Sequence, residues 1–287
     1  MSWHLGFVEG GLNGIFLNSS LKVNWVYSPY KDRWFADPFI LDVTDSKIYV
    51  LVEEFVHKTQ IGRIAKLTID KNRMAIEKMD IILELPTHLS FPNILRKDGH
   101  IYIYPENCRS GKQDIYEYDE KTNSLRFIQT ICNDIIWDAT MTDYFGRIQL
   151  FTAKSNDYYL DIYEWNEEAS RFLYLKSIES DKKNSRMAGQ LFKYNGEIYC
   201  PCQNCERTYG GAVDIKKAVY RESDSNLSFE FVKQVKPEGK YNKGLHTLNS
   251  YKGWTIIDAK EYDYYIGRFL GFLIEIKKKI VRNYANR

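Results

Sequence analysis

Short runs in which apolar and polar residues alternate fill most of the first 265 residues, as in KIYVLVEE and HIYIYPEN. Polar segments such as DEKTNS, NEEAS and ESDSN separate several of these runs. A period of two residues is typical of β-strands, and short polar segments between such runs indicate hairpin turns. The pattern therefore predicts a chain built mainly of strand pairs.

One phrase recurs five times: a small or polar opening, an apolar strand, a turn with Gly or Asp, and a second strand. The copies are ADPFILDVTDSKIYVLVEE, SFPNILRKDGHIYIYPEN, DATMTDYFGRIQLFTAK, AGQLFKYNGEIYCPCQN and LHTLNSYKGWTIIDAK. They open near residues 36, 90, 138, 188 and 245, a spacing of about 50 residues that is typical of a propeller blade. A second strand pair follows most copies, as in GRIAKLTIDKNRMAIEK after the first.

Four strands per repeat, repeated five times, predict an all-β fold: a five-bladed β-propeller over residues 1–265. The fifth repeat stops after its inner strand pair. The strand-like N-terminal stretch GIFLNSSLKVNWVYSP has no repeat of its own, so we expect it to complete the fifth blade. An irregular β-sandwich is the alternative, but sandwiches carry no such regular period.

Residues 266–287 differ from the repeats. Their apolar residues are spaced three and four apart, which predicts a short amphipathic helix: Ile266, Phe269, Leu270, Leu273, Ile276 and Ile280. Its end is basic, with three consecutive lysines at 277–279. The helix either packs on the propeller or makes a peripheral contact with an anionic membrane.

The first strand of each propeller blade lines the central channel, so the residues that open the repeats are expected to meet at one end of the axis. These residues are Asp37, His88 with Ser90, Asp138, Arg186 with Gln190, and His246. Glu54 and Glu106 end second strands, which return to the same end of the blade. We therefore expect a single polar pocket in which Asp37, Asp138 and Glu106 are the candidate catalytic carboxyl groups.

The residue types in this pocket indicate a carbohydrate ligand. Enzymes that cleave glycosides use paired carboxylates about 5–9 Å apart. A mixture of acids with Arg and His also suits binding of a polar or anionic sugar or a nucleotide sugar. The candidate substrate-binding residues are Trp34, Glu54, His88, Ser90, Arg186, Gln190, Gln203, Tyr209 and His246. A structural alternative stays open for each type: the acids could cap turns, the histidines could be structural, and the aromatic rings could pack between blades.

Several motifs arrive in order and at blade spacing: EEF, HLSFPNI, IYIYPEN, WDAT, RMAGQLFKYNGEIY, QNCERTYGG and GLHTL. Together they resemble the N-terminal-type domain of glucosamine inositolphosphorylceramide transferases, whose bacterial relatives often accompany polysaccharide-synthesis or sugar-formylating domains. The stretch WFADPF is more distantly similar to the first blade of five-bladed glycoside hydrolases of the invertase, levansucrase and arabinanase class. This second resemblance implies Asp37 as nucleophile or base and Asp138 as the supporting acid.

The chain departs from those hydrolases at one position. They place the general-acid Glu at the opening of the fourth blade, where this chain has RMAGQ at residues 186–190 and no carboxylate. Loss of a proton donor costs about 10²–10⁴-fold in rate. Glu106 or Glu54, from other blades, could take its place, and Glu106 is the acid that we expect.

Composition narrows the class of partner. Of the 287 residues, 44% are hydrophobic and 27% charged, and the net charge of +2 gives no reason to expect nucleic-acid binding. Aromatic residues reach 15%, which suits both sheet surfaces and sugar stacking. The opening MSWHLGFVEGG lacks the pattern of a signal peptide, so we expect a cytoplasmic protein, free or peripheral at the inner membrane face.

The chain has five cysteines, and three of them form the cluster CPCQNC, which resembles half of a zinc site. Zinc needs four N or S ligands, and no second Cys or His pair stands at a matching spacing. Buried thiols are the favoured interpretation, and we expect neither a metal nor another cofactor.

These observations predict a carbohydrate-active propeller of surface or capsular polysaccharide metabolism, acting on a glycoside or an activated sugar by a glycosidase-like or glycosyl-transfer reaction. The alternative is a non-catalytic sugar-binding or scaffold module of a polysaccharide-synthesis complex. The expected partners are a carbohydrate or nucleotide-sugar ligand and polysaccharide-synthesis enzymes. Turnover of a sugar substrate separates the two hypotheses.

Overall fold

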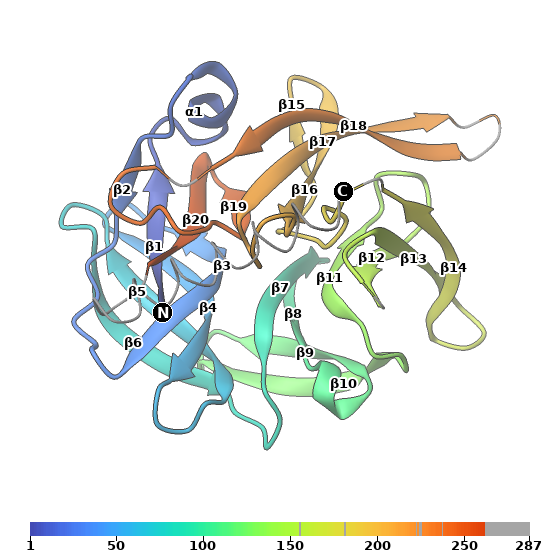
Figure 1. Cartoon of the computed structure of the whole chain (residues 1–287). Helices are drawn as coiled ribbons and strands as arrows, with labels where there is room; N and C mark the ends of the chain where they lie inside the picture. The colour runs from blue at the N-terminus through green and yellow to red at the C-terminus, as the bar shows by residue number, and fades with distance from the viewer. Residues whose placement is uncertain (155, 181, 222, 224–225, 237, 262–287) are drawn as a thin grey trace, which may run out of the picture.

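The computed structural model describes residues 1–154, 156–180, 182–221, 223, 226–236 and 238–261. They form five four-stranded antiparallel sheets that surround a central axis (Figure 1). Consecutive strands of one sheet are hydrogen-bonded neighbours, as the repeats with their polar hairpin turns require. The predicted five-bladed, nearly all-β propeller is confirmed.

Four of the blades each consist of four consecutive strands, numbered from the channel outwards. Blades 1 and 2 contain β3 (Arg33–Val43), β4 (Lys47–Val56), β5 (Gly62–Asp70), β6 (Ala75–Leu83), β7 (Ser90–Lys97), β8 (His100–Glu106), β9 (Gln113–Asp119) and β10 (Ser124–Cys132), with a 3₁₀ turn η1 (Cys108–Ser110). Blades 3 and 4 contain β11 (Trp137–Thr142), β12 (Gln149–Ala153), β13 (Tyr159–Asn166), β14 (Arg171–Glu179), β15 (Phe192–Tyr194), β16 (Glu197–Asn204), β17 (Ala212–Arg221) and β18 (Asn226–Val235).

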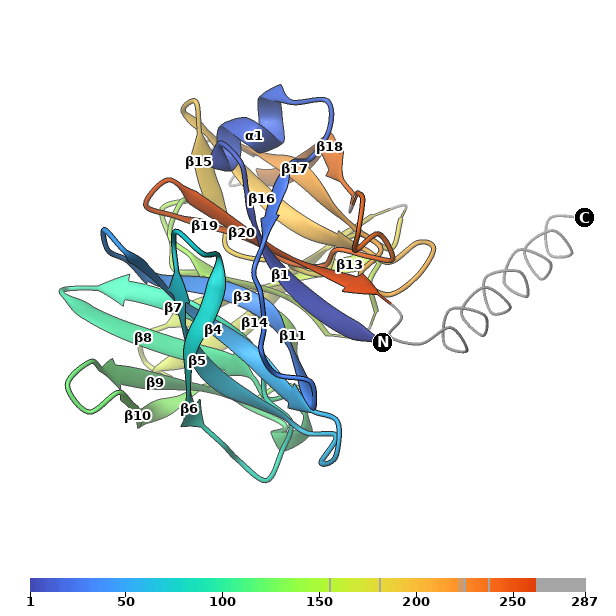
Figure 2. The same cartoon turned by 90° about the vertical axis from the view of Figure 1, so that its left-hand side faces the viewer.

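The fifth blade joins the two ends of the described chain. Its order is β19 (Leu248–Tyr251), β20 (Trp254–Glu261), β1 (Ser2–Val8) and β2 (Val23–Trp25), so N-terminal strands complete it (Figure 2). The sheet pairs β1 antiparallel to β20 over residues 2–7. This arrangement ties the beginning of the chain to the last repeat and closes the ring.

One detail of the N-terminal prediction was wrong. The segment expected to be strand from residue 14 begins inside a helix, α1 (Gly11–Leu17). Two consecutive glycines, Gly10 and Gly11, take left-handed φ angles of 74° and 59° and turn the chain away from β1. Ile15 and Phe16 then pack with the apolar residues of blade 4, where the Phe16 ring stacks on Tyr194 at 4.3 Å. Tertiary packing overrides the strand-like composition of this stretch.

The predicted C-terminal helix at 266–287 lies outside the described residues. Within the part of the chain that the structure describes, no helix has the length and apolar character needed to cross a membrane.

The same β-bulge opens the inner strand of three blades. Between the pairs Ala36–Glu53 and Phe39–Leu51, β3 uses one residue more than β4, and the equivalent slip follows Ser90 in β7 and Trp137 in β11. The bulged residues Asp37, Phe91 and Asp138 have left-handed φ angles of 50°, 44° and 50°. A bulge redirects its side chain and leaves backbone groups outside the ladder. The bulges therefore place both aspartates at the same level of two different blades.

Polar side chains join the inner strands along the channel. Asn93 Nδ2 donates to Thr140 Oγ1 of the next blade at 2.9 Å, and Gln190 Nε2 reaches Asn93 Oδ1 at 3.0 Å. Asn249 Nδ2 donates to the Pro38 carbonyl oxygen at 2.9 Å. The side chain of Gln190, which we expected to line the polar pocket, thus forms hydrogen bonds between inner strands.

Candidate functional site

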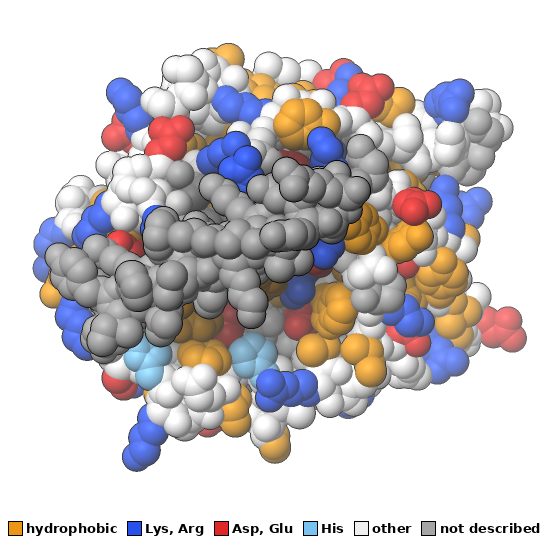
Figure 3. Space-filling view, viewed as in Figure 1, with side chains coloured by type: hydrophobic (Ala, Val, Ile, Leu, Met, Phe, Trp, Pro, Cys, Tyr) orange, Lys and Arg blue, Asp and Glu red, His pale blue; other side chains and the backbone are white. Residues whose placement is uncertain are grey.

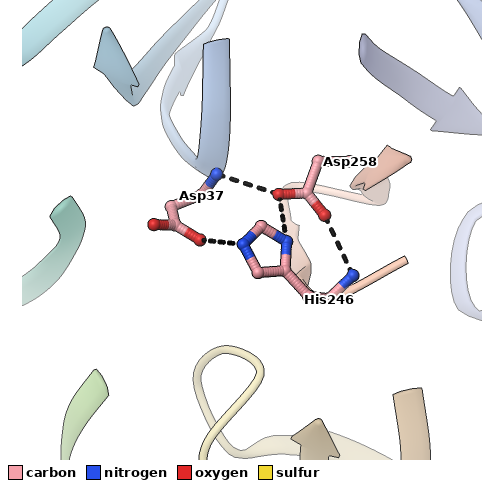
Figure 4. A group of neighbouring side chains, drawn as sticks. All are labelled: Asp37, His246 and Asp258. Atoms are coloured by element: carbon pink, nitrogen blue, oxygen red, sulfur yellow. Dashed lines mark hydrogen bonds and ion pairs between the residues drawn. The ribbon is translucent and has the colours of Figure 1, made fainter. Parts of the chain in front are cut away.

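A carboxylate–imidazole–carboxylate group joins blades 1 and 5. His246 Nε2 lies 3.3 Å from Asp37 Oδ1, and His246 Nδ1 lies 2.7 Å from Asp258 Oδ2 (Figure 4). All three residues are buried, and the Trp3 ring stacks on the imidazole at 3.9 Å. We call these residues the Asp37–His246–Asp258 triad.

Backbone N–H groups bind both carboxylates of the triad. Asp258 accepts the N–H groups of Asp37 at 3.0 Å, His246 at 3.1 Å and Thr247 at 2.9 Å. Asp37 Oδ2 accepts the N–H of the next blade's bulged residue, Phe91, at 3.1 Å. Asp37 thus caps a backbone N–H group of the next blade, and its other oxygen faces the His246 ring.

The electrostatics of the triad favour a protonated imidazole. Burial lowers the pKa of His246, but the Asp258 and Asp37 charges outweigh burial and raise that pKa to about 9. Burial raises the pKa of Asp37 well above its ordinary value, against the His246 charge. Burial also acts to raise the pKa of Asp258, yet the His246 charge and the hydrogen bonds it accepts lower it overall. An imidazolium between two carboxyl groups follows from these shifts.

The triad also has the donor types of a metal site. One ligand atom from each residue lies within 4.8 Å of the others. The contacts do not fit a resident ion, because the carboxylate oxygens already accept backbone N–H groups and both ring nitrogens face carboxylates. Of the cysteines in CPCQNC, Cys200 and Cys202 are buried in β16 and Cys205 is half-buried just after it.

A second group of polar side chains joins blades 2, 3 and 4. The Arg186 guanidinium forms an ion pair with Asp138 through Nε and lies 3.6 Å from Glu106 Oε2 through Nη2. Gln203 Nε2 donates to Asp138 Oδ2 at 2.6 Å. Glu106 Oε2 accepts the Asp138 backbone N–H at 2.8 Å. We call these residues the Glu106–Asp138 cluster.

The two carboxyl groups of this cluster have different surroundings. Burial, followed by the neighbouring Asp138 charge, raises the pKa of Glu106 to about 8 despite the opposing Arg186 charge. Asp138 instead has the guanidinium and the Gln203 amide as direct partners. Near neutral pH, Glu106 is therefore a proton donor beside a carboxylate whose charge Arg186 balances, an arrangement that serves acid–base chemistry.

Tyr209 contacts both groups from the loop between β16 and β17. Its ring packs edge-on against His246 at 5.6 Å, and the Arg186 guanidinium lies 5.4 Å from its centroid. The Trp137 ring lies on Arg186 at the same distance of 5.4 Å. Gly210 fits closely here, since a Cβ on it would lie 2.6 Å from the His246 Cβ. Tyr209 is 47% exposed, so the ring can meet a ligand from solvent.

Blade 1 contributes a different acid from the predicted one. Glu54 is fully buried and pairs with Arg33 at 2.5 Å and Arg63 at 2.8 Å. Its neighbour Glu53, which sequence reasoning missed, points to the opposite face of β4 and lies 3.2 Å from His88 Nε2. Glu53 also interacts electrostatically with Asp37 and His246, which places it in the site.

The remaining predicted residues lie at the same end of the blades. Ser90 is buried directly opposite Glu106 in the β7–β8 pair. Trp34 stacks on Phe55 at 4.5 Å, and Phe55 packs edge-on against His88. The space-filling view of this face shows acidic, histidine and hydrophobic side chains close together near its middle (Figure 3). Asp258 was missed because a single acid inside the apolar run TIIDAK has no distinguishing motif.

The fold and this site define a carbohydrate-related, five-bladed propeller protein with a carboxyl-rich site where the blades meet. Residues 23–255 match the protein family described as glucosamine inositolphosphorylceramide transferase 1, N-terminal, and the chain belongs to that family. The predicted resemblance is thereby confirmed.

Two plant proteins named glucosamine inositolphosphorylceramide transferase 1 illustrate the match. The Arabidopsis thaliana protein is 28% identical over 233 residues, covering 75% of this chain and 29% of the plant protein. The protein of Oryza sativa subsp. japonica is 24% identical over 225 residues, covering 71% and 30% of the two chains. This chain therefore spans less than a third of the length of these relatives.

Solved structures share the fold at low sequence identity. A GH43 β-xylosidase/α-arabinofuranosidase from a compost microbial metagenome aligns with a TM-score of 0.56 and 14% identity, covering 79% of this chain and 86% of that one. A GH43_1 enzyme from Xanthomonas citri aligns with a TM-score of 0.53 and 13% identity, covering 83% and 90%. These likenesses show the propeller fold.

Proposed function

We propose that this propeller binds a glycosyl unit of a glycoside or activated sugar at the Glu106–Asp138 cluster and acts on it in surface or capsular polysaccharide metabolism. The observation that carries the proposal is the buried pair in which Glu106 keeps a proton near neutral pH while Arg186 and Gln203 hold Asp138. Acid–base assignments are found where neighbouring titratable groups have different environments.

In the proposed reaction Glu106 transfers its proton to the glycosidic oxygen as the bond from that oxygen to the anomeric carbon breaks. The bonding electron pair leaves with the oxygen, and positive charge develops on the sugar ring. The Asp138 carboxylate stabilises this charge. A water molecule or an acceptor hydroxyl then attacks the anomeric carbon, and its proton returns to Glu106.

The relatives support a carbohydrate ligand in general terms. The plant proteins are named for transfer involving a glucosamine inositolphosphorylceramide, and the GH43 structures are of a β-xylosidase/α-arabinofuranosidase and related enzymes. Both sets of names support a carbohydrate as the class of ligand for this chain.

A non-catalytic sugar-binding module is the second candidate. Two observations favour it: Arg186 occupies the fourth-blade opening, and both oxygens of Asp37 have partners within the protein. In this function the same cluster binds sugar hydroxyl groups without bond cleavage.

Asp138→Asn is expected to weaken sugar binding by about tenfold or more, because the charge-assisted acceptor of the cluster is lost. Isothermal titration of wild type and variant against xylotriose, glucosamine-containing oligosaccharides and uridine-diphosphate sugars measures the effect. The exposed Asp143, in the β11–β12 turn of the same blade, provides the matched control Asp143→Asn. Equal affinity of wild type and a folded Asp138→Asn variant would contradict the proposed site, and turnover by wild type separates the enzyme from the binding module.

A further inference from the structure

Glu53 occupies the same position in blade 1 that Glu106 occupies in blade 2. Each lies on the second strand of its blade, opposite the residue just before the bulge. Ala36 pairs with Glu53, and Ser90 pairs with Glu106. The two acids differ in what they bind. Glu106 accepts the N–H of the next blade's bulged residue, Asp138, whereas the corresponding N–H in blade 2 binds Asp37 instead of Glu53. Glu53 therefore does not form the hydrogen bond between blades that Glu106 forms.

A neighbouring histidine orients Glu53. The Gly62 backbone N–H donates to His88 Nδ1 at 2.9 Å, so Nδ1 is an acceptor and the proton of the neutral ring is on Nε2. That nitrogen lies 3.2 Å from Glu53 Oε1 and can donate to it. Gly62 makes the approach possible, because a Cβ there would lie 2.7 Å from Glu53 Oε1 and 2.8 Å from His88 Cε1.

The second oxygen of Glu53 accepts no hydrogen bond from a described residue, although the side chain is only 7% exposed. An acceptor oxygen on a mostly buried side chain is stabilised when a ligand or a water molecule donates a hydrogen bond to it. Burial raises the pKa of Glu53, while the hydrogen bond from His88 and the more distant His246 charge oppose this rise. Asp37 and Asp258 also interact electrostatically with Glu53.

We propose that Glu53 is a ligand-contacting residue of this site, whose Oε2 accepts a hydrogen bond from a sugar hydroxyl group while His88 positions the carboxylate. The inference rests on the proposed function, since it assigns a further contact to the same glycosyl unit. Trp34 and Phe55 stack beside His88 and extend this wall of the site with aromatic rings, which suit the apolar face of a sugar.

The neighbouring acids Glu53 and Glu54 provide a matched pair for the test. They are consecutive in β4, but Glu54 is enclosed by Arg33 and Arg63 on the other face of the strand. Titration calorimetry of Glu53→Gln and Glu54→Gln with the tightest-binding sugar of the panel above gives the affinities, and thermal unfolding gives the stabilities. We expect Glu53→Gln to weaken binding about tenfold with little change in stability, and Glu54→Gln to lower stability with binding retained.

The pH dependence tests the positioning role of His88. Wild-type affinity is expected to fall as the pH drops and Glu53 gains a proton. This fall in affinity should begin at a higher pH in His88→Ala and should be absent in Glu53→Gln. Wild-type affinity in a folded Glu53→Gln variant, or an equal loss of affinity in Glu54→Gln, would overturn the inference. If Asp138→Asn loses binding while Glu53→Gln keeps the wild-type affinity, the proposed function stands and the role of Glu53 fails. If no sugar in the panel binds wild type, both fail.

Discussion

Glu106→Gln is expected to reduce turnover of a glycoside by about 10²–10⁴-fold, the usual contribution of a positioned general acid. Gln is isosteric with Glu and can still accept the Asp138 N–H through its carbonyl oxygen, so the bond between blades 2 and 3 remains possible. It has no carboxyl proton to give to a leaving oxygen. The fold of the site is kept while its proton donor is removed.

The pH profile provides an independent readout of the same variant. Because the pKa of Glu106 is raised to about 8, the wild-type rate is expected to fall as the pH rises through that value. The residual rate of Glu106→Gln should lack this basic limb. The exposed Glu120, in the β9–β10 turn of the same blade, provides the control Glu120→Gln. A Glu106→Gln variant with the wild-type rate and profile would remove Glu106 from the mechanism.

His246→Gln is expected to lower the free energy of unfolding by about 3–5 kcal/mol, the range found when one partner of a buried ion pair is removed. The imidazolium lies between two buried carboxyl groups and beneath the Trp3 ring, and Gln cannot supply its charge. Urea unfolding measures the loss. His100 is the control, because it is an exposed histidine paired with Glu117.

The pH dependence of stability follows from the raised pKa of His246. The folded value of about 9 exceeds the ordinary value of 6.5, so the folded state binds the proton more tightly. The contribution is complete below about pH 6.5 and is lost as the pH rises towards 9, by roughly 3 kcal/mol. The raised pKa of Glu106 acts in the same direction between about pH 4.5 and 8. The difference between wild type and His246→Gln isolates the histidine, and a difference that stays constant from pH 6 to 9.5 would refute its charged state.

Much of the fold could be predicted from the sequence because propeller blades repeat their strand and turn pattern at a nearly constant interval. The openings of the repeats meet as expected: Asp37 and His246 are in contact, and so are Asp138 and Arg186. The partners could not be predicted, because they depend on side-chain directions at bulges between blades. Neither motif indicates that Asp37 binds a backbone N–H of the next blade or that Asp138 binds a guanidinium.

The adjacent acids Glu53 and Glu54 show why the direction of a side chain is hard to predict from the sequence. Successive side chains of a strand point to opposite faces, so an error of one residue moves an acid from the site to the far side of the sheet. Both acids stand in VEEF, and the bulge in β3 shifts the pairing by one residue just opposite them. The helix α1 was missed for a related reason, since its apolar residues fit a strand until the glycine turn at Gly10 and Gly11 is known.

A crystal structure of the chain with the tightest-binding sugar of the panel shows whether the carboxyl-rich end of the propeller is the glycosyl site. We expect a sugar ring within hydrogen-bond distance of Glu106 and Asp138, with Tyr209 beside it. Density for the sugar elsewhere, with the Glu106–Asp138 cluster contacting only protein atoms, would refute this site. One such place is the groove between α1 and the end of β18 that Asn18, Lys233 and Glu238 line.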